Sequence, residues 1–451
     1  MSLERRLGQN PGLYNEYKAF MQEYEDMGHM VSIAAEDLHK VKYFIPHSCV
    51  VKPDSTSTKV RVVFDASAKT TSGVSLNDIQ IVGPTIQREL FDQLIEFKTH
   101  DKVLMADIAK MYRLILITDQ DTWLQCILWR YSPEKSLKAY RLMTVTYGEA
   151  SSSFLACREL HEVAEKYREI NPNIANIIQQ SFYVDNLMIG ASTTTELMSM
   201  KQHIEQALLR HGFPLRKWAA NDMCALAGIP EQDLKPLIQV GDQEVIKTLG
   251  VAWNPNKDVF QFISVNATSK ALKALTKRQM VSKILRLYDP LGLVQPVIVT
   301  AKILMQELWT NNISWDDEVP DYVFNAWMKY EALLAELKHI EVPRMTIPSQ
   351  TIVLDLHGFS DASEKAYGYA IYLHSIDLRG NESTKLLCAK ARVTQLKKVT
   401  LPRLELLAAV LLAELAVKRF SGGFELDKIH EPTLGNIYQE RNHEDTRLHE
   451  T

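Results

Sequence analysis

The chain has 451 residues, 46% hydrophobic and 24% charged, which is typical of a globular protein with room for two to four domains. Its formal net charge of −4 excludes a general electrostatic attraction to nucleic acid, so any such surface must be local. The five scattered cysteines include no CxxC pair, which argues against a zinc site and a disulfide framework. The start lacks an apolar signal core, and the apolar run at 406–413 is too short to span a bilayer. We therefore expect an intracellular, cytoplasmic protein without a membrane partner.

The first 225 residues divide into a helical lead and a mixed domain. Residues 1–44 have an amphipathic pattern that predicts helix, with Gly28 as a helix stop. Between residues 45 and 225 strands and helices alternate, which predicts an α+β domain with a largely antiparallel sheet. We expect strands at 59–67, at 102–117 (with a turn or helix beginning at Asp107), at 123–130, 139–148 and 180–190, and helices at 151–169 and 192–211.

The second half of the sequence predicts two further regions and a tail. Residues 226–345 are mostly helical in pattern, and a turn from Asp289 to Gly292 divides one long stretch into two helices. Residues 346–420 form an α/β unit, with two strand patterns after residue 351 and an apolar helix at 401–420. The polar segment 421–451 is expected to be a poorly ordered tail.

Two aspartates stand where apolar strands end. Asp107 follows "KVLMA", and Asp185 follows "SFYV". If the two strands are neighbours, both carboxylates meet at one edge, where like charges are stable only around cations. A pair of Mg²⁺ ions held in this way is a clamp for in-line phosphoryl displacement. Taken singly, an aspartate at a strand end is more often a turn residue.

Nearby residues supply a context for such chemistry. Tyr112, five positions after Asp107, could form the floor beneath an incoming sugar and clash with a 2′-hydroxyl. Gly148 would let the backbone approach a base pair closely. Arg61, with Lys59 as a weaker candidate, could bind a triphosphate through charge-assisted hydrogen bonds. Each residue alone also fits a structural role as a core tyrosine, a turn glycine or a solvated basic residue.

A series of longer motifs runs through residues 5–430 in a fixed order. It includes "LMADIAKMYRLI", "VTYGEASSSFLA", "FYVDNLMIG", "LRKWAAND", "YDPLGLVQPVIVTAKILMQELW", "GFSDASEKAYGYAIYL" and "LPRLELLAAVLLAEL". Together these motifs resemble the reverse transcriptase of BEL/Pao long-terminal-repeat retrotransposons. The resemblance implies a right-hand polymerase, with fingers and palm at 45–225 and thumb and connection at 226–345. It also implies a primer-grip hairpin at 247–254 and a partial ribonuclease H-like domain at 346–420.

The resemblance assigns roles to single residues. Asp107 and Asp185 match the two metal-binding aspartates. Tyr112 matches the sugar gate and Arg61 the triphosphate-binding arginine. The loop that supports the nucleotide is matched by Tyr147 and Gly148, and the lysine near the triphosphate by Lys217, for which a solvated charge is an equal alternative.

The polymerase motifs depart from the family pattern at two places. Asn186 stands where the family has a second aspartate, and an amide oxygen ligates Mg²⁺ far less strongly than a carboxylate. The family has threonine, alanine and proline where this chain has Glu149, Ser152 and Ser153. A glutamate beside a nucleotide pocket is unfavourable unless it faces solvent. Both departures predict weakened polymerisation.

The nuclease part is incomplete in pattern. Asp361 and Glu405 match the first catalytic aspartate and the helix glutamate of ribonuclease H, but the next acidic motif is not found after 426–430. We predict that this part is inactive. The Asp-Thr/Ser-Gly turn of aspartic peptidases does not occur in the sequence, which argues against peptidase activity.

A basic stretch at 266–288 has six lysines and arginines and no acid. On a helical thumb it would follow a phosphate backbone, although a solvated basic face explains it equally well. Its basic residues are Lys270, Lys273, Lys277, Arg278, Lys283 and Arg286.

Two functions follow. The first is an RNA-directed DNA polymerase that uses Mg²⁺, with Mn²⁺ as a possible substitute, on an RNA or DNA template-primer and deoxynucleoside triphosphates. The second is a catalytically inactive, retrotransposon-derived protein that keeps the fold and binds nucleic acid. Asn186 and the interrupted nuclease favour the second. The first is favoured by the intact residues Asp107, Tyr112, Arg61 and Asp185. The sequence leaves the oligomeric state open.

Overall fold

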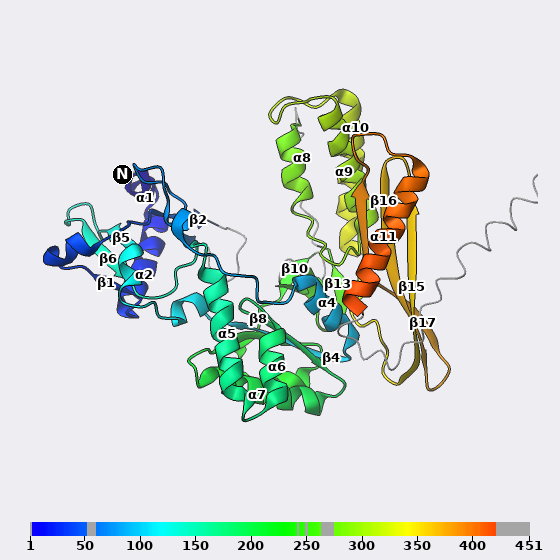
Figure 1. Ribbon diagram of the computed structural model, residues 1–451, viewed down its shortest axis with the longest axis horizontal. Helices are drawn as coiled ribbons and strands as arrows, with labels where there is room; N and C mark the ends of the chain where they lie inside the picture. Colours follow the sequence, from blue (N-terminus) through cyan, green and yellow to red (C-terminus); the bar gives the residue numbers. More distant parts are fainter. Residues whose placement is uncertain (1, 52–59, 241–242, 249–250, 263–274, 421–451) are drawn as a thin grey trace, which may run out of the picture.

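The computed structural model describes residues 2–51, 60–240, 243–248, 251–262 and 275–420 (Figure 1). Lys59, Lys270, Lys273 and the predicted tail therefore lie outside the described residues. The described part is a mixed helix and sheet protein, with its N-terminal elements at the left of Figure 1 and its C-terminal sheet at the right. None of its described helices is long and apolar enough to cross a membrane.

The helices and strands alternate along most of the chain. The α-helices are α1 (Ser2–Gly8), α2 (Pro11–Asp26), α3 (Leu76–Ile79), α4 (Leu90–Thr99), α5 (Ser152–Arg168), α6 (Pro172–Gln180), α7 (Thr194–Leu209), α8 (Lys277–Ile284), α9 (Gln295–Thr310), α10 (Asp321–Leu334) and α11 (Leu401–Phe420). The strands are β1 (Met30–Ser32), β2 (His47–Val51), β3 (Val60–Phe64), β4 (Lys102–Ile108), β5 (Cys126–Trp129), β6 (Lys138–Leu142), β7 (Phe182–Tyr183), β8 (Asn186–Ala191), β9 (Leu215–Ala220), β10 (Ile238–Val240), β11 (Gln243–Thr248), β12 (Val251–Asn254), β13 (Val259–Gln261), β14 (Glu341–Pro343), β15 (Thr351–Ala362), β16 (Ala366–Asp377) and β17 (Glu382–Val393).

The N-terminal helices belong to a larger packing unit. Asn10 caps α2 by accepting a hydrogen bond from the backbone N–H of Leu13, and Pro11 occupies the first turn, where its missing N–H costs nothing. The buried face of α2, including Tyr17 and Tyr24, packs in one core with β3, β5 and β6. β1 pairs with β6. The N-terminal helices thus share a core with residues up to 142. The sequence pattern predicts a separate helical segment at 1–44, because β1 is too short to give a strand pattern.

A four-stranded antiparallel sheet, in the order β7-β8-β4-β9, forms the centre of the molecule. β4 is buried along nearly its whole length, so it reads as a continuous apolar run with no alternation. Leu104 and Ala106 face the core made with α5, α6 and α7, while Val103 and Met105 face α4 and the buried Trp253. The side chains of α5 to α7 therefore cover one face of this sheet.

The expected strand at 180–190 is a hairpin. Phe182 and Tyr183 pair with Leu187 and Asn186, which leaves Val184 and Asp185 as a two-residue turn. Val184 has φ 56°, a left-handed conformation that is unusual for a β-branched residue. Because residues 180–190 are mostly apolar, the sequence pattern shows one strand and gives no sign of this turn. Helix α6 was also not predicted, although Asn171 and Pro172 give it a standard start.

The region 226–345 contains more strand than its pattern predicts. A five-stranded antiparallel sheet, in the order β10-β11-β12-β13-β14, precedes and follows the helices α8, α9 and α10. The strands are short, at most six residues, which explains the weak sequence signal. The hairpin expected at 247–254 corresponds to parts of β11 and β12, and its residues 249–250 lie outside the described chain.

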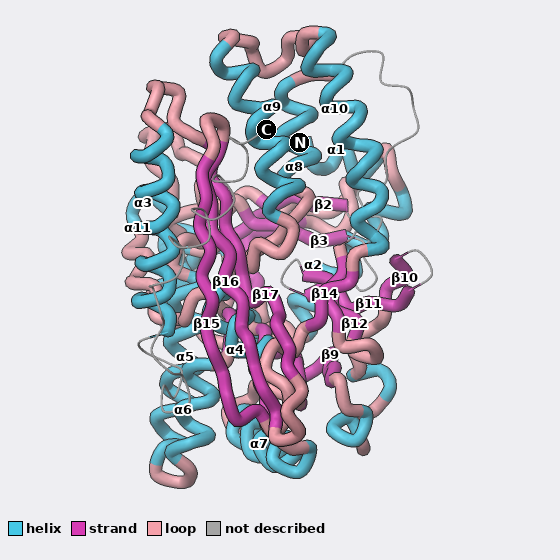
Figure 2. Tube along the Cα trace, turned by 90° about the vertical axis from the view of Figure 1, so that its right-hand side faces the viewer, coloured by secondary structure: helices cyan, strands magenta, loops and turns pink. Residues whose placement is uncertain are grey.

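The C-terminal unit is a three-stranded antiparallel sheet, β15-β16-β17, of three long strands. Two of these strands were predicted; β17 was not. Helix α11 covers one face, where Leu412 lies against Gly358. No helix of the described part of the chain covers the opposite face, which is turned toward the viewer in Figure 2; Phe359, next to Gly358 on β15, is 54% exposed.

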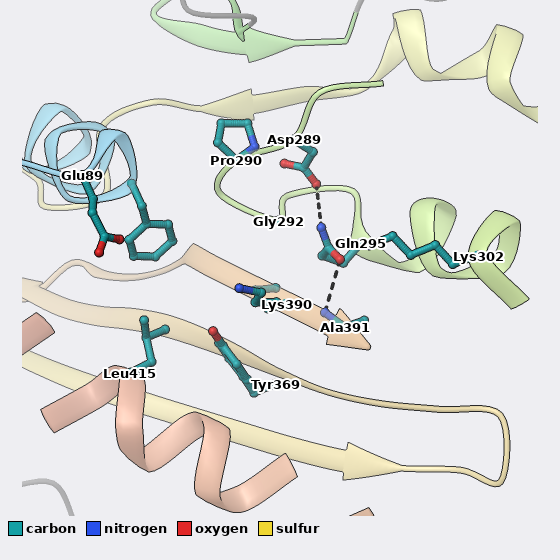
Figure 3. A pocket seen from close by; sticks show the side chains of 12 residues that line it. Glu89, Asp289, Pro290, Gly292, Gln295, Lys302, Tyr369, Lys390, Ala391 and Leu415 are labelled. Carbon is teal, nitrogen blue, oxygen red and sulfur yellow. Dashed lines mark hydrogen bonds between the residues drawn. The ribbon is translucent and has the colours of Figure 1, made fainter. Parts of the chain in front are cut away.

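The start of α9 fastens this sheet to the preceding helices. Both carboxylate oxygens of Asp289 accept hydrogen bonds from the N-terminal backbone of α9, and burial raises the pKa of Asp289. Gln295 links Asp289 to the backbone N–H of Ala391 on β17 (Figure 3). Gly292 has φ 75°, and a side chain there would overlap the carbonyl oxygen of Ala389. A pocket of about 370 Å³ opens beside this joint, lined in part by Tyr369.

Arg344 forms a second joint between distant segments. Its side chain is 0% exposed and bonds Asp258 through two nitrogens, at 2.6 and 2.7 Å. It also donates hydrogen bonds to the carbonyl oxygens of Phe97, His100 and Asp101, which lie at the end of α4 and just beyond it. One buried guanidinium therefore holds together α4, the β12–β13 turn and the segment after β14.

A buried lysine lies beside this joint and makes stability depend on pH. Lys98 is 0% exposed, and burial lowers its pKa to about 7, with Arg344 and Lys385 lowering it further. Between about pH 7 and about pH 10.5 the unfolded chain keeps a proton on Lys98 that the folded chain lacks, so stability rises with pH. Wild-type protein should gain up to about 1.4 kcal/mol per pH unit relative to Lys98→Met in this window. Urea unfolding at two alkaline pH values measures the difference, and Lys166→Met, a change at an exposed lysine of α5 that leaves Lys98 in place, should keep the wild-type slope.

Candidate active site

The two predicted metal-binding aspartates come together in the structure. Asp107 lies near the end of β4 and pairs across the sheet with Asn186, the first residue of β8. Asp185 is in the preceding turn, and its carbonyl oxygen accepts a hydrogen bond from Ile108 at 2.8 Å. Burial raises the pKa of Asp185, and the nearby Asp107 carboxylate raises it further. The β4–β8 pairing thus produces the carboxylate pair that the sequence predicts.

Two lysines and one amide contact this pair. The Lys217 Nζ lies 2.6 Å from Oδ2 of Asp107, and the Lys235 Nζ lies 3.8 Å from Oδ1. Asn186 donates a hydrogen bond to Asp185 at 2.8 Å. Lys217 has φ 54°, a left-handed conformation on β9. Its ammonium group contacts the Asp107 carboxylate, whereas the sequence predicts a position near a triphosphate.

The donor set fits a divalent cation. Oδ1 of Asp107 is buried and accepts no hydrogen bond, so its lone pairs are available to a metal ion. The second carboxylate, Asp185, is half-buried and adjacent. Oxygen ligands of this kind suit Mg²⁺ and Mn²⁺. Among the described residues no group of three or more histidine, cysteine, aspartate and glutamate side chains has the arrangement of a metal site. Asp107 and Asp185 would hold such an ion.

The predicted sugar-gate and triphosphate residues lie around the carboxylates. The Tyr112 hydroxyl is 3.3 Å from Oγ of Ser153; burial raises the pKa of Tyr112, and the Asp185 charge raises it further. Arg61 is exposed on β3, with its guanidinium carbon 5.5 Å from the centre of the Tyr147 ring. The Arg61 charge also reaches Tyr112, since it lowers the pKa of that phenol slightly. Arg61, Tyr112 and Asp185 therefore border one region.

The predicted glycine loop has a firm structural requirement. Gly148 has φ 104°, and a side chain at this position would overlap the carbonyl oxygen of Phe64. Asn77 holds the loop from both sides: it donates to the Gly148 carbonyl at 3.2 Å and accepts from the Ala150 N–H at 2.8 Å. The Tyr147 hydroxyl donates to the Val62 carbonyl at 2.9 Å. The loop is therefore fixed against β3.

Glu149 does not face open solvent. Its Oε2 accepts a hydrogen bond from Gln80 at 2.8 Å, while Oε1 is buried without a hydrogen-bond partner. Burial raises the pKa of Glu149. The unfavourable alternative raised by the sequence is thus the one observed, and a buried carboxyl group lies next to Gly148.

The expected phosphate-tracking stripe is wrong for part of the basic stretch. Lys277 is 4% exposed, donates to the Ile313 carbonyl and lies 4.5 Å from the centre of the Trp309 ring. Lys283 forms a largely buried ion pair with Glu331. Arg278 is exposed and pairs with Asp316, and Arg286 is exposed. Arg278 and Lys283 thus fasten α8 to its neighbours through acids from other segments, which a local charge count does not show.

The predicted nuclease residues do not form a carboxylate cluster in the described part of the chain. Asp361 lies near the end of β15 and Glu405 in the second turn of α11, and both are exposed. The helix and strand are packed together by Leu404, Tyr367 and Ala362, so the frame that carries these acids is formed.

Three residues of the site were not predicted. Lys235 is reached through a loop with no motif of its own. Asn77 gives only the capping pattern of a short helix. Gln87 accepts a hydrogen bond from the Val184 N–H at 3.0 Å and so steadies the turn that carries Asp185. Only the basic residue Lys235, in "EQDLKPLIQV", offers any signal in the sequence, and a single lysine is too common to be diagnostic.

Comparisons with known proteins agree with this arrangement. The chain is similar to a foamy viral protease-reverse transcriptase, solved in complex with double-stranded DNA, with a TM-score of 0.53 and 15% sequence identity. The match covers 88% of this chain and 59% of that chain, so this sequence spans less than two thirds of the viral protein. No curated protein matches the chain. At this identity the likeness concerns the fold.

A family model matches the C-terminal third. Residues 276–423 match the Pao retrotransposon-like RNaseH-like domain, a range that starts inside the predicted thumb and includes α8 to α11. The matched range includes both α9 and β17, which are joined by the hydrogen bond from the Ala391 N–H to Gln295. The resemblance to BEL/Pao retrotransposons found in the sequence is therefore confirmed over residues 276–423, and the fold of the chain is similar to that of the foamy viral protein.

Proposed function

We propose that this protein is an RNA-directed DNA polymerase module that uses Mg²⁺ or Mn²⁺ and acts on a template-primer and deoxynucleoside triphosphates. The observation that supports this most strongly is the meeting of Asp107 and Asp185 at the end of the β4–β8 pair. In this proposal the units around β2–β3 and β5–β6 are the fingers and the four-stranded sheet is the palm. β11 and β12 form the primer grip, and α8 to α10 form the thumb.

The surrounding residues would orient the substrate. A bound divalent cation would supply Lewis-acid stabilisation of the phosphoryl group. Asp107 and Asp185 hold it. Arg61, on the exposed side of β3, binds the triphosphate by charge-assisted hydrogen bonds. The Tyr112 ring lies beneath the sugar and excludes a 2′-hydroxyl, and Gly148 leaves room for the base pair.

Primer extension on an RNA template tests the function. Asn186→Asp is expected to raise extension by about tenfold or more, because a third carboxylate beside Asp107 and Asp185 strengthens cation binding. The measurement is product length with Mg²⁺ and with Mn²⁺. Asn171→Asp is a matched control, since Asn171 caps α6 through its side-chain oxygen and aspartate caps equally well. Absence of extension by both wild-type and Asn186→Asp protein would contradict the proposal.

A second function is favoured by specific observations. Asn186 replaces an acid, Lys217 already contacts Asp107, and Glu149 places a carboxyl group beside the glycine loop. These features suit an inactive protein that retains the fold and binds nucleic acid. In that case neither protein extends a primer, while both retain a template-primer duplex in a filter-binding assay. For the ribonuclease H-like domain we propose an inactive frame, with Asp361 and Glu405 as its remnant acids.

A further inference from the structure

The charges at the carboxylate pair are balanced within the chain. Asp107 and Asp185 bring two negative charges, Asn186 brings none, and the ammonium groups of Lys217 and Lys235 bring two positive charges. A site of this composition has less charge to attract metal ions than one with three carboxylates. The two lysines are therefore part of the electrostatics of the site.

The two lysines differ in how easily their ammonium groups can move away from Asp107. The side chain of Lys217 is 47% exposed, so it can turn to water when a cation approaches Asp107. The side chain of Lys235 is 11% exposed. Its backbone N–H donates to the carbonyl of Trp218 on β9 at 2.9 Å, and Leu234 forms a β-bridge with the same residue. Lys235 is thus held in place by its own backbone.

The position of Lys235 leaves Asp107 able to bind a metal ion. Its Nζ is 3.8 Å from Oδ1, an ion-pair distance, and that oxygen accepts no hydrogen bond. Lys235 therefore contributes positive charge without occupying the lone pairs of the oxygen. A segment between β9 and β10, which includes the short 3-10 helices η4 (Met223–Leu226) and η5 (Glu231–Asp233), carries the lysine to this point.

We propose that Lys235 is a built-in cation of the active site, and that the Asp107–Asp185 pair consequently binds a single divalent ion. The proposal rests on the function proposed above, because it assumes that this pair is the metal site. Lys217 leaves when the ion enters, and Lys235 stays. Asn186 fits the same arrangement, since a third carboxylate is not needed where one of two cations is supplied by the protein.

Mn²⁺ binding to the full chain tests this proposal without any measurement of catalysis. Electron paramagnetic resonance of free Mn²⁺ should give one site per wild-type chain, which Asp107→Asn abolishes. Lys235→Met should tighten Mn²⁺ binding by about tenfold, because a positive charge within a few ångströms is removed. Lys235→Arg, which keeps the charge, and Lys257→Met, an exposed lysine paired with Glu341, should leave the affinity unchanged. The double variant Asn186→Asp, Lys235→Met should bind two ions.

Several results would overturn the proposal. Two Mn²⁺ ions of equal affinity in wild-type protein, or an unchanged affinity in folded Lys235→Met, exclude a resident cation. Thermal melting of each variant shows whether it is folded, and Lys235→Arg reports the role of charge if the methionine variant does not fold. If primer extension fails but Mn²⁺ binds as expected, the proposed polymerase activity is refuted and the assignment of Lys235 stands. Mn²⁺ binding that survives Asp107→Asn refutes the assignment of the metal site itself.

Discussion

Replacing Arg344 with methionine is expected to lower the free energy of unfolding by about 3–5 kcal/mol. The guanidinium is fully buried and satisfies both oxygens of Asp258 together with the carbonyl oxygens of Phe97 and His100. Methionine fills a similar volume but removes the donor to the two carbonyl oxygens and leaves the Asp258 charge without its cationic partner, although neutral side chains still donate to Asp258. Urea unfolding followed by circular dichroism measures the loss.

Arg278→Met is the matched control for this change. Arg278 bonds Asp316 with the same two-nitrogen geometry, at 2.7 and 2.9 Å, but its side chain is 63% exposed. Water screens such a pair, and its removal should cost about 1 kcal/mol or less. Equal losses in the two variants would show that burial of the Arg344 pair adds nothing to stability.

Asp107→Asn is expected to reduce nucleotide transfer by about a thousandfold or more, if the protein is the polymerase proposed here. The change keeps the shape of the side chain and removes the negative charge that holds the cation. It also leaves Lys217 and Lys235 without their counter-charge, so repulsion between the ammonium groups adds to the loss. Single-nucleotide extension at saturating Mg²⁺ is the measurement.

Asp316→Asn provides the comparison, because this aspartate is 74% exposed and remote from Asp107 in its contacts. The melting temperature of Asp107→Asn must be measured beside that of wild-type protein. A folded Asp107→Asn protein that extends a primer at the wild-type rate would remove Asp107 from the mechanism.

The sequence predicted the parts of this site that depend on local pattern. Asp107 and Asp185 each follow an apolar run, and pairing of the two strands brings them together as expected. Gly148 was predicted from its small size, and its left-handed backbone explains why only glycine fits. A helix was predicted at 192–211, and α7 begins there with Thr193 as its N-cap, which accepts a hydrogen bond from the Glu196 N–H.

The remaining features depend on contacts between distant residues. Lys235 reaches Asp107 only through the bridge between Leu234 and Trp218, which no periodicity indicates. Lys277 looks like a phosphate-binding residue until Trp309, more than thirty positions later, packs over it. The five-stranded sheet escaped prediction because its strands are shorter than the window over which alternation can be recognised.

The contact between Arg344 and His100 has a consequence for biosynthesis. The two residues are 244 positions apart, so the ribosome adds that many residues after the end of α4 before the guanidinium exists. At usual elongation rates this delay is on the order of tens of seconds. During that time the carbonyl groups at the end of α4 lack the donor that binds them in the folded protein. The contacts that Arg344 makes at the end of α4 can therefore form only after translation has passed the middle of the chain and reached residue 344.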